Sequence, residues 1–474
     1  MAAQKKTKTF FLDQHGCAKN QVDGELIATR LITAGYTKTE DPSQADLIII
    51  NSCGFIESAK KESLDSLMGA RSAYPKAKII LAGCLAERYA ENFKDNLPEA
   101  DGIFGNGDLS LIEKTAAQVL KGKRSVVKPE QNGVCCGNRS LNLGFKGSVF
   151  VKITEGCNNC CSFCAIPLIR GQLRSRNAKE IIDEIKSLVK SGVKEINLIG
   201  QDLAAYGTGK TDDVFNDGNS RRKECGSFLK RLLDSISKIK GNFWVRLLYI
   251  HPDHFSSDIL EPLKKDKRLL PYFDIPLQSG STPVIRAMNR TGSSASYKKL
   301  IKEIRSAFSE SAIRTTFLTG FPGETDEDAE NTESFLKAIK PDWSGCFTYS
   351  REEDTPAYRL KPQVPKKTAE ARKNNLCRIQ EEITRTLLKK RTGKIYDVLV
   401  EEILSAPENS DSSDEGLAIG RAWFQAPEVD GNVVIKYDLT DKNAVKSIQP
   451  GEFVKVHITS ASDVDLDGDF CGKQ

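Results

Sequence analysis

The sequence of 474 residues lacks the marks of secreted and membrane proteins. It contains no run of eighteen apolar residues, so we expect no transmembrane helix and no membrane partner. Its start, MAAQKKTKTFFLDQ, has neither the apolar stretch nor the cleavage site of a signal peptide. Thirteen cysteines in such a chain indicate metal chemistry in a reducing compartment, and we therefore expect a cytoplasmic protein.

Several ligand-binding motifs are incomplete or absent. The stretch YGTGKTDD around Lys210 is similar to a phosphate-binding loop, but Ala204 stands where the first glycine is required. The acidic tail SDVDLDGDFCGKQ lacks the glutamate that completes a calcium loop, and we expect it to be disordered. No flavin or nicotinamide fingerprint occurs.

Four cysteines lie within eight residues in GCNNCCSFC, directly after the apolar run SVFVKIT. Cys157, Cys161 and Cys164 have the spacing C-x3-C-x2-C. A [4Fe–4S] cluster is normally held by four thiolates, so three closely spaced thiolates leave one iron open to a small molecule. Cys160 is surplus to this pattern, and we assign it no role.

The alternatives to an iron–sulfur cluster explain these cysteines less well. A zinc site uses C-x2-C pairs separated by a dozen or more residues, whereas here the pairs are back to back. A disulfide framework belongs to short secreted chains, and structural cysteines rarely cluster so densely. A protein that uses a cluster only structurally is a further alternative, but it gains nothing from an open coordination site.

Residues 8–125 predict an N-terminal domain of alternating strands and helices. Its apolar runs TFFLD, DLIIIN and KIILAG are each followed by a cysteine, namely Cys17, Cys53 and Cys84. In a parallel sheet ligands gather beyond the carboxyl ends of the strands, so the three cysteines should meet at one edge. Coincidence is the competing interpretation, but three matching positions favour a second, incomplete cluster site.

Residues 147–365 repeat the strand–helix pattern about six times, which predicts an open, partial (β/α)6 barrel with its chemistry at the carboxyl ends of the strands. One such end carries the turn GFPGE, and we expect Gly320 and Glu324 to contribute to cofactor binding there. His251, which precedes a proline, is expected to cap a turn. The polar excursion 207–225 has no assigned role.

A long helix rich in both charges is predicted for residues 366–391, followed by short strands that predict a small OB-like β-barrel over residues 392–461. The fold class is therefore α/β with a C-terminal β-barrel. From Lys394 to Gln474 there are 16 Asp and Glu against 7 Lys and Arg, a charge of −9, whereas the whole chain carries +5. An acidic domain repels a phosphate backbone and suits a basic protein partner, although a merely solvated acidic surface is an equal alternative.

These segments together resemble the radical S-adenosylmethionine (SAM) methylthiotransferases, from Phe10 to about Ser460. Within that family the chain is most similar to the branch that modifies a ribosomal protein, with LRSR and QAPEVDG as the more discriminating stretches. The resemblance is carried by HGCAKNQVDGE, NSCGFIESAKKES, GCNNCCSFCAIPLIRGQLRSR, LLYIHPDHF, YFDIPLQSGS, RTTFLTGFPGETDED, FTYSREEDTPA and GRAWFQAPEVDG.

The resemblance implies a reaction and a set of partners. Cys157, Cys161 and Cys164 would hold the cluster that binds and splits SAM, and Cys17, Cys53 and Cys84 would hold an auxiliary [4Fe–4S] cluster that delivers sulfur. The C-terminal barrel would be a TRAM domain. The substrate would be the β-carbon of an aspartate on protein twelve of the small ribosomal subunit, with a second SAM giving the methyl group. Flavodoxin or a similar electron donor and an unidentified sulfur donor are implied; the alternative substrate is a modified adenosine in tRNA.

Overall fold

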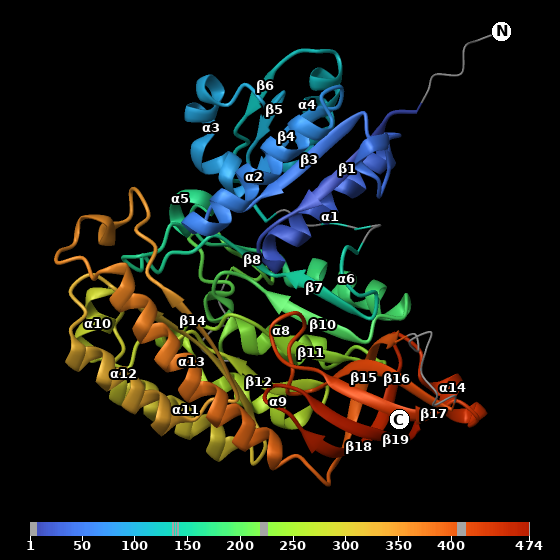
Figure 1. The fold of residues 1–474 in the computed structure, drawn as a ribbon, viewed down its shortest axis with the longest axis vertical. Coiled ribbons are helices and arrows are strands. Elements are labelled where there is room, and N and C mark those ends of the chain that lie inside the picture. The colour runs from blue at the N-terminus through green and yellow to red at the C-terminus, as the bar shows by residue number, and fades with distance from the viewer. Residues whose placement is uncertain are drawn as a thin grey trace.

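The computed structural model describes residues 7–134, 137, 139, 142–218, 226–404 and 414–473, so residues 219–225 of the polar excursion lie outside it. The chain forms three bodies in sequence order, which Figure 1 colours from blue through green and yellow to red. An N-terminal α/β domain lies above a larger α/β body, and a small β-barrel lies against the larger body's side. None of the helices in the described ranges has the length and apolar content needed to cross a bilayer.

The N-terminal domain is built on a six-stranded sheet in which every pairing is parallel, with the order β2-β1-β3-β4-β5-β6. Strands β1, β3 and β4 are the three predicted from the sequence, whereas the short strands β2, β5 and β6 were not predicted. The strands are β1 (Thr9–Gln14), β2 (Thr37–Lys38), β3 (Leu47–Ser52), β4 (Lys78–Gly83), β5 (Gly102–Phe104) and β6 (Ser125–Val127). The helices are α1 (Ala18–Thr33), α2 (Glu57–Ala73), α3 (Cys84–Asn96) and α4 (Ile112–Leu120).

The larger body contains a second six-stranded, all-parallel sheet with the order β14-β13-β12-β11-β10-β7, which confirms the predicted open (β/α)6 barrel. Its strands are β7 (Ser148–Lys152), β10 (Glu195–Ile199), β11 (Trp244–Leu247), β12 (Leu269–Asp274), β13 (Ala312–Thr319) and β14 (Trp343–Thr348). A two-stranded ribbon of β8 (Thr154–Glu155) and β9 (Arg174–Ser175) frames the segment that contains the cysteine motif.

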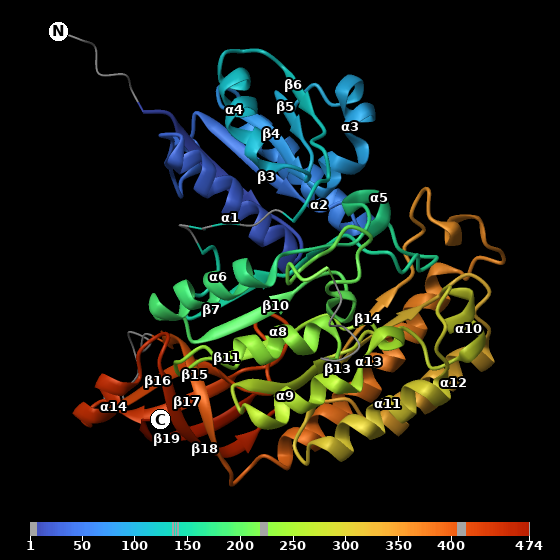
Figure 2. The ribbon, with the colours of Figure 1, turned by 180° about the vertical axis from the view of Figure 1, so that it is seen from behind.

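Helices cover the outer face of this sheet, as Figure 2 shows from behind. Their starts follow the capping rules: Ser293 and Thr325 each form a capping box at the helix they precede. The long charged helix predicted for residues 366–391 is observed as α13. The helices are α5 (Ile166–Arg170), α6 (Ala178–Lys190), α8 (Phe228–Ile236), α9 (Leu260–Lys265), α10 (Thr282–Ala287), α11 (Ser294–Ala307), α12 (Asp326–Ile339) and α13 (Lys366–Lys389).

The C-terminal body is a closed five-stranded barrel with the order β15-β16-β17-β19-β18. Its elements are β15 (Ile395–Leu404), β16 (Glu415–Ala422), β17 (Val433–Asp438), α14 (Lys442–Ser447), β18 (Phe453–Ala461) and β19 (Leu466–Lys473). The prediction that the acidic tail is disordered was wrong, because β19 pairs with both β17 and β18 and closes the barrel. Its acidic residues gave this segment the composition of a solvated tail. In the strand they alternate with Leu466 and Gly468, which are buried.

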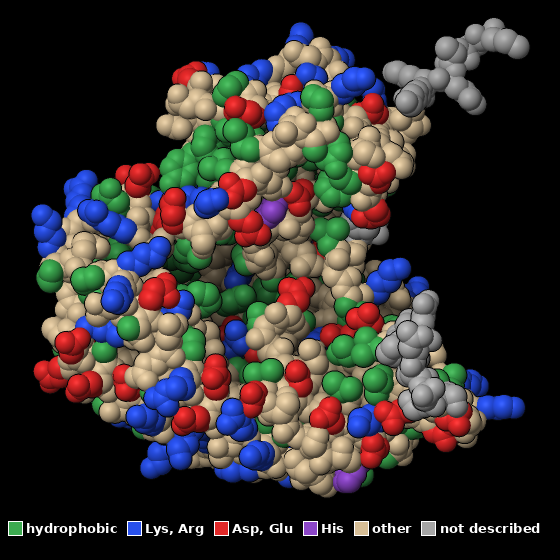
Figure 3. Space-filling view, viewed as in Figure 1, with side chains coloured by type: hydrophobic (Ala, Val, Ile, Leu, Met, Phe, Trp, Pro, Cys, Tyr) green, Lys and Arg blue, Asp and Glu red, His purple; other side chains and the backbone are tan. Residues whose placement is uncertain are grey.

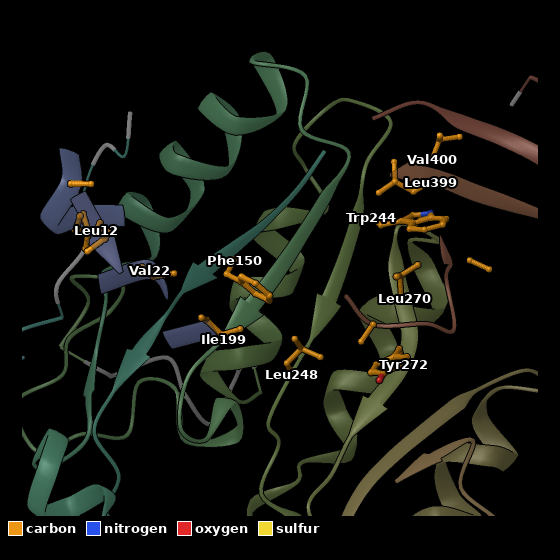
Figure 4. Close-up of a cluster of buried hydrophobic side chains, with 14 of the residues drawn as sticks. Leu12, Val22, Phe150, Ile199, Trp244, Leu248, Leu270, Tyr272, Leu399 and Val400 are labelled. Atoms are coloured by element: carbon orange, nitrogen blue, oxygen red, sulfur yellow. The ribbon is translucent and has the colours of Figure 1, made fainter. Parts of the chain in front are cut away.

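The inner face of the large sheet is filled by the other two bodies rather than by its own helices. Figure 4 shows Leu12 and Val22 of the N-terminal domain at one end of a continuous apolar cluster and Leu399 and Val400 of the small barrel at the other. Phe150, Trp244 and Tyr272 of the large sheet lie between them in the same view, among further apolar side chains. All three bodies therefore share one core.

A buried ion-pair cluster fixes the small barrel to the large sheet. Glu195, the first residue of β10, lies 2.8 Å from Arg246 of β11 and 2.6 Å from Arg421 of β16, and all three side chains are buried. Burial alone would raise the pKa of Glu195, but Arg421 and Arg246 outweigh it and lower the pKa from 4.5 to about 2. The carboxylate therefore stays charged and holds two strands and two bodies together.

We predict that Glu195→Gln destabilises the protein at pH 7 by about 3–5 kcal/mol, because two buried guanidinium groups lose their partner. Since the folded pKa is lowered, the stabilisation is complete above about pH 4.5 and is lost as the pH falls towards 2. The variant should lack that acid-dependent loss. Urea unfolding followed by tryptophan fluorescence measures this directly, because Trp244, Trp343 and Trp423 all lie in or against the shared core.

Lys455→Met is the matched control, because it removes an exposed ion pair of the same barrel, 3.3 Å from Asp397. Exposed ion pairs contribute little to stability. The free energy of unfolding of this variant should therefore equal that of the wild-type protein both at pH 7 and at acidic pH. A Glu195→Gln protein as stable as the wild type at pH 7 would contradict the proposed role of the cluster.

Candidate active site

The three cysteines of the N-terminal domain meet at one sheet edge, as the strand pattern predicts. Cys17 directly precedes α1, Cys53 follows β3 and Cys84 begins α3 after β4, and the strands β1, β3 and β4 are neighbours. Burial raises the pKa of Cys53 to about 12, and the nearby Cys84 and Cys17 thiols add to that shift. The pKa of Cys17 is lowered instead, because the positive charges of Lys19 and Arg170 outweigh the effect of packing around its thiol.

Glycines beside these cysteines let the three loops approach one another closely. Gly16 has φ +87°, and a Cβ there would lie 3.0 Å from Cys53 Cβ and 3.3 Å from its sulfur. A Cβ at Gly54 would lie 2.8 Å from the backbone carbonyl of Cys84. Contacts this short are not tolerated, so any side chain at Gly54 must push two cysteine loops apart.

The second trio lies in the loop between β8 and α5. Cys161 is buried, Cys157 and Cys164 are partly buried, and Cys160 is exposed with φ +47°. Backbone N–H groups of Asn159 and Ile166 point at the sulfurs of Cys157 and Cys164, each at 3.5 Å. N–H donors aimed at thiolates are characteristic of iron–sulfur ligand loops, where they tune the cluster.

The two trios lie next to each other in space. Cys84 packs in one small buried cluster with Ala165 and Ile169, the first of which directly follows Cys164. Arg170, the last residue of α5, donates through Nη2 to the Cys84 sulfur at 3.1 Å. Helix α5 therefore connects the loop of one trio to a cysteine of the other.

Four buried charges surround this connection. Arg170 Nη1 lies 2.9 Å from Asp23 Oδ2 and donates to Glu155 Oε1 at 2.8 Å. Lys152 pairs with the same two carboxylates, donating to Glu155 Oε2 at 2.6 Å. Burial alone would raise the pKa of Glu155, but Arg170 and Lys152 hold it well below its usual range. The sequence offered no signal for this network, because its members come from α1, β7, β8 and α5.

Asp202 ties the loop after β10 to the second trio. Its buried carboxylate accepts from Asn159 Nδ2 at 3.0 Å and lies 2.8 Å from His254 Nδ1. His251 accepts from the N–H of Asp253, so the predicted turn cap is confirmed, and its Nε2 also lies 3.8 Å from the Cys161 sulfur. A pocket of about 350 Å³ between Cys157, Asp202 and His254 opens beside these groups.

The GFPGE turn closes the carboxyl end of β13. Glu324 Oε2 accepts from the Gly320 N–H at 2.5 Å and from Arg372 of α13 at 2.8 Å. Burial raises the pKa of Glu324, and these two partners only partly offset it. In this arrangement Glu324 shapes the turn, whereas Gly320 faces the large cleft.

A cleft of about 1400 Å³ lies between the N-terminal domain and the barrel, and Figure 3 shows the surface hollowed there. One wall comes from the segment 55–65, which includes the start of α2, and the other from β13, β14 and α13. Phe163, between two cysteines of the second trio, and Gln278 form part of its lining. Glu352 holds the walls together, since it pairs with Lys60 at 3.1 Å and with Arg88 at 2.6 Å.

Both trios fit a cluster better than a single ion. Within the described ranges, no three or more His, Cys, Asp or Glu side chains converge as the ligands of one metal ion do. The cysteines of a cluster each bind a different iron, so they surround a larger volume. Each site offers three thiols. In the N-terminal trio, glycines let the cysteine loops approach closely, and in the second trio N–H groups are directed at sulfur, as a cluster requires.

Three family models match the chain in the same order as the three bodies. The model described as Uncharacterized protein family UPF0004 matches residues 9–105. The Radical SAM superfamily matches residues 151–336, and the TRAM domain matches residues 392–471.

Two relatives of similar length carry the same name. A protein of Treponema denticola called ribosomal protein uS12 methylthiotransferase RimO is 55% identical over 96% of this chain and 99% of its own length. A protein of the same name from Thermoanaerobacter is 37% identical over 96% of this chain and 98% of its own. Among solved structures, the radical SAM methyltransferase TsrM of Kitasatospora setae shares the fold, with a TM-score of 0.52, 14% identity and coverage of 74% and 77%.

We predict that Gly54→Ala halves the iron content after anaerobic reconstitution, from about eight to about four atoms per chain. The added Cβ would displace the Cys84 backbone, whereas the second trio is untouched. Gly69→Ala in α2 is the control, because no heavy atom lies within 4 Å of its Cβ position. Full iron content in Gly54→Ala would show that the close approach at Cys84 is not required.

Proposed function

Because the chain belongs to the family of ribosomal protein uS12 methylthiotransferases, radical SAM enzymes named RimO, we propose that it adds a methylthio group to the β-carbon of an aspartate in uS12. We further propose two [4Fe–4S] clusters, one on Cys157, Cys161 and Cys164 and one on Cys17, Cys53 and Cys84. An external electron donor such as flavodoxin and a separate sulfur donor would complete the system.

The contact between the two cysteine trios carries this proposal. Sulfur insertion needs a carbon radical and a sulfur source within reach of one substrate atom. Cys84 packs against Ala165 and Ile169, and Arg170 joins the two loops, so both trios border one region. An enzyme that used SAM alone would have no need for the N-terminal trio of Cys17, Cys53 and Cys84.

The bound groups would supply an electron that splits SAM, a 5′-deoxyadenosyl radical that removes hydrogen from the substrate carbon, and the sulfur that replaces it. The chain's own residues place these groups. The N–H groups of Asn159 and Ile166 orient two thiolates, and Asp202 anchors the cysteine loop through Asn159. Gly320 and Gln278 border the cleft from the barrel side and are proposed to contact SAM.

The cleft provides a path for a protein loop. Its volume of about 1400 Å³ exceeds that of an ordinary small-molecule pocket and suits an extended peptide. Its walls come from two bodies clamped by Glu352, Lys60 and Arg88, so substrate enters a preformed groove. Phe163, between two cysteines of the second trio, lines this groove and would shield the reacting carbon from water.

Charge favours a basic protein over tRNA. The segment from Lys394 to Gln474 carries −9, and its barrel is fixed to the large sheet by Glu195 and Arg421. Its acidic surface therefore has a constant position relative to the cleft. A phosphate backbone would be repelled there, whereas a ribosomal protein rich in Lys and Arg would be attracted.

Incubating the reconstituted enzyme with SAM, a low-potential reductant and either purified uS12 or tRNA tests the substrate. We expect the mass of one methylthio group on uS12 aspartate and none on tRNA nucleosides. Modification of tRNA alone would contradict the proposed substrate, and absence of 5′-deoxyadenosine would contradict radical SAM chemistry altogether.

We predict that Cys53→Ala separates the two sites. The variant should lose about half its iron and all methylthio transfer, yet still produce 5′-deoxyadenosine from SAM, because Cys157, Cys161 and Cys164 remain. Cys161→Ala should abolish 5′-deoxyadenosine. Cys471→Ala, at an exposed position of β19, serves as the control and should retain both activities. Loss of SAM cleavage in Cys53→Ala would argue against separate sites.

A further inference from the structure

Arg170 links the two cysteine trios: it ends the helix that follows Cys164, and its side chain contacts Cys84 of the N-terminal trio. It ends helix α5, which begins two residues after Cys164, and its guanidinium is buried. One nitrogen, Nη2, donates to the Cys84 sulfur at 3.1 Å and lies 3.4 Å from Asn20 Oδ1. The other, Nη1, is held by Asp23 and Glu155. One terminal nitrogen of the planar guanidinium therefore contacts sulfur, and the other contacts the two carboxylates.

The carboxylates fix the guanidinium but do not cancel its effect on sulfur. Asp23 and Glu155 are shared with Lys152, so two buried positive and two buried negative charges balance one another. Gln201 Nε2 also donates to Glu155 Oε1 at 3.0 Å. The Nη2 arm is thus directed at Cys84 by a rigid, charge-balanced frame and adds an N–H donor next to a thiolate.

The two trios differ in the sign of the charged side chains that act on them. Around the N-terminal trio, Lys19 and Arg170 both act on Cys17, and Arg170 touches Cys84. Around the second trio, the N–H donors are backbone groups at 3.5 Å, and the carboxylate of Asp202 acts on Cys157. Arg290 acts on Cys164 only at longer range, and its described hydrogen bonds go to the carbonyls of Pro276 and Leu277.

We propose that Arg170 is a positioning residue that sets the reduction potential of the N-terminal cluster above that of the SAM-binding cluster, through its hydrogen bond to Cys84. This inference rests on the proposed two-cluster function. A reduced cluster carries one more negative charge, so donors and positive charges at its sulfurs favour the reduced state. The same side chain fixes the distance between the two cysteine loops, because α5 is only one and a half turns long.

A redox titration monitored by electron paramagnetic resonance tests the proposal on the full-length, reconstituted protein. A Cys157→Ala/Cys161→Ala/Cys164→Ala background isolates the signal of the N-terminal cluster, and the protein with both trios is titrated beside it. In Arg170→Met the ratio of reduced to oxidised N-terminal cluster at the wild-type midpoint should fall by about tenfold, the effect of one charge-assisted hydrogen bond. For one electron that is a downward shift of about 59 mV.

Lys152→Met is the matched control. Lys152 touches the same two carboxylates as Arg170, so its removal disturbs the same network without removing an observed donor to sulfur. Its midpoint should shift clearly less than that of Arg170→Met, because the donor to the Cys84 sulfur remains. Equal shifts in both variants, or no shift in Arg170→Met, would overturn the proposal, because the effect would then belong to the network or be absent.

Arg170→Lys keeps the positive charge but not the fork, since an ammonium is a point charge that cannot bind the carboxylates and the sulfur in the same planar geometry. We expect an intermediate midpoint in this variant, which also serves if Arg170→Met fails to assemble the cluster. A wild-type midpoint in Arg170→Lys would overturn the role of the hydrogen bond. Iron analysis separates the two hypotheses: four irons in the wild-type protein would contradict the two-cluster function, whereas eight irons with unchanged midpoints would contradict this inference alone.

Discussion

The contact between the N-terminal domain and the barrel depends on four buried charges that pair with one another. Asp23 comes from the N-terminal domain, whereas Lys152, Glu155 and Arg170 come from the segment around the cysteine motif. Removing any one leaves an uncompensated charge in a dry interface, which costs about 3–5 kcal/mol. The same network aims Arg170 at Cys84, so the requirement for charge balance also determines how the two trios face each other.

The large sheet depends on its neighbours in a second way. An open barrel has an inner face that its own helices do not cover, and here α1 and residues 421–430 cover it. Asp430 accepts from Tyr272 and pairs with Arg314, while Trp343 donates to the Phe424 carbonyl. The stretch QAPEVDG thus contributes Ala426 and Asp430 to the contact between the small barrel and the large sheet.

The features that follow from local hydrophobic periodicity could be predicted from the sequence. These are the (β/α)6 barrel, the long helix α13 and the three strand ends that carry Cys17, Cys53 and Cys84. Local periodicity did not predict β19, because acidic residues on the solvent face of a strand look like a solvated tail. It also missed Arg170 and the hydrogen bond between Asn159 and Asp202, because the partners lie in different elements and leave no periodic signal. The turn cap at His251 was foreseen, but its contact with Cys161 was not, because it depends on two strands coming together.

The order of the strands in the small barrel has a consequence for how the protein is made. Synthesis runs from the N-terminus, and β19, the strand between β17 and β18 that closes the cylinder, leaves the ribosome after every other described element. Residues 421–430 cannot settle permanently against the large sheet before that closure. The part of the inner apolar face that residues 421–430 cover is therefore exposed while the chain is being synthesised, and such exposed apolar surface favours aggregation until the barrel closes.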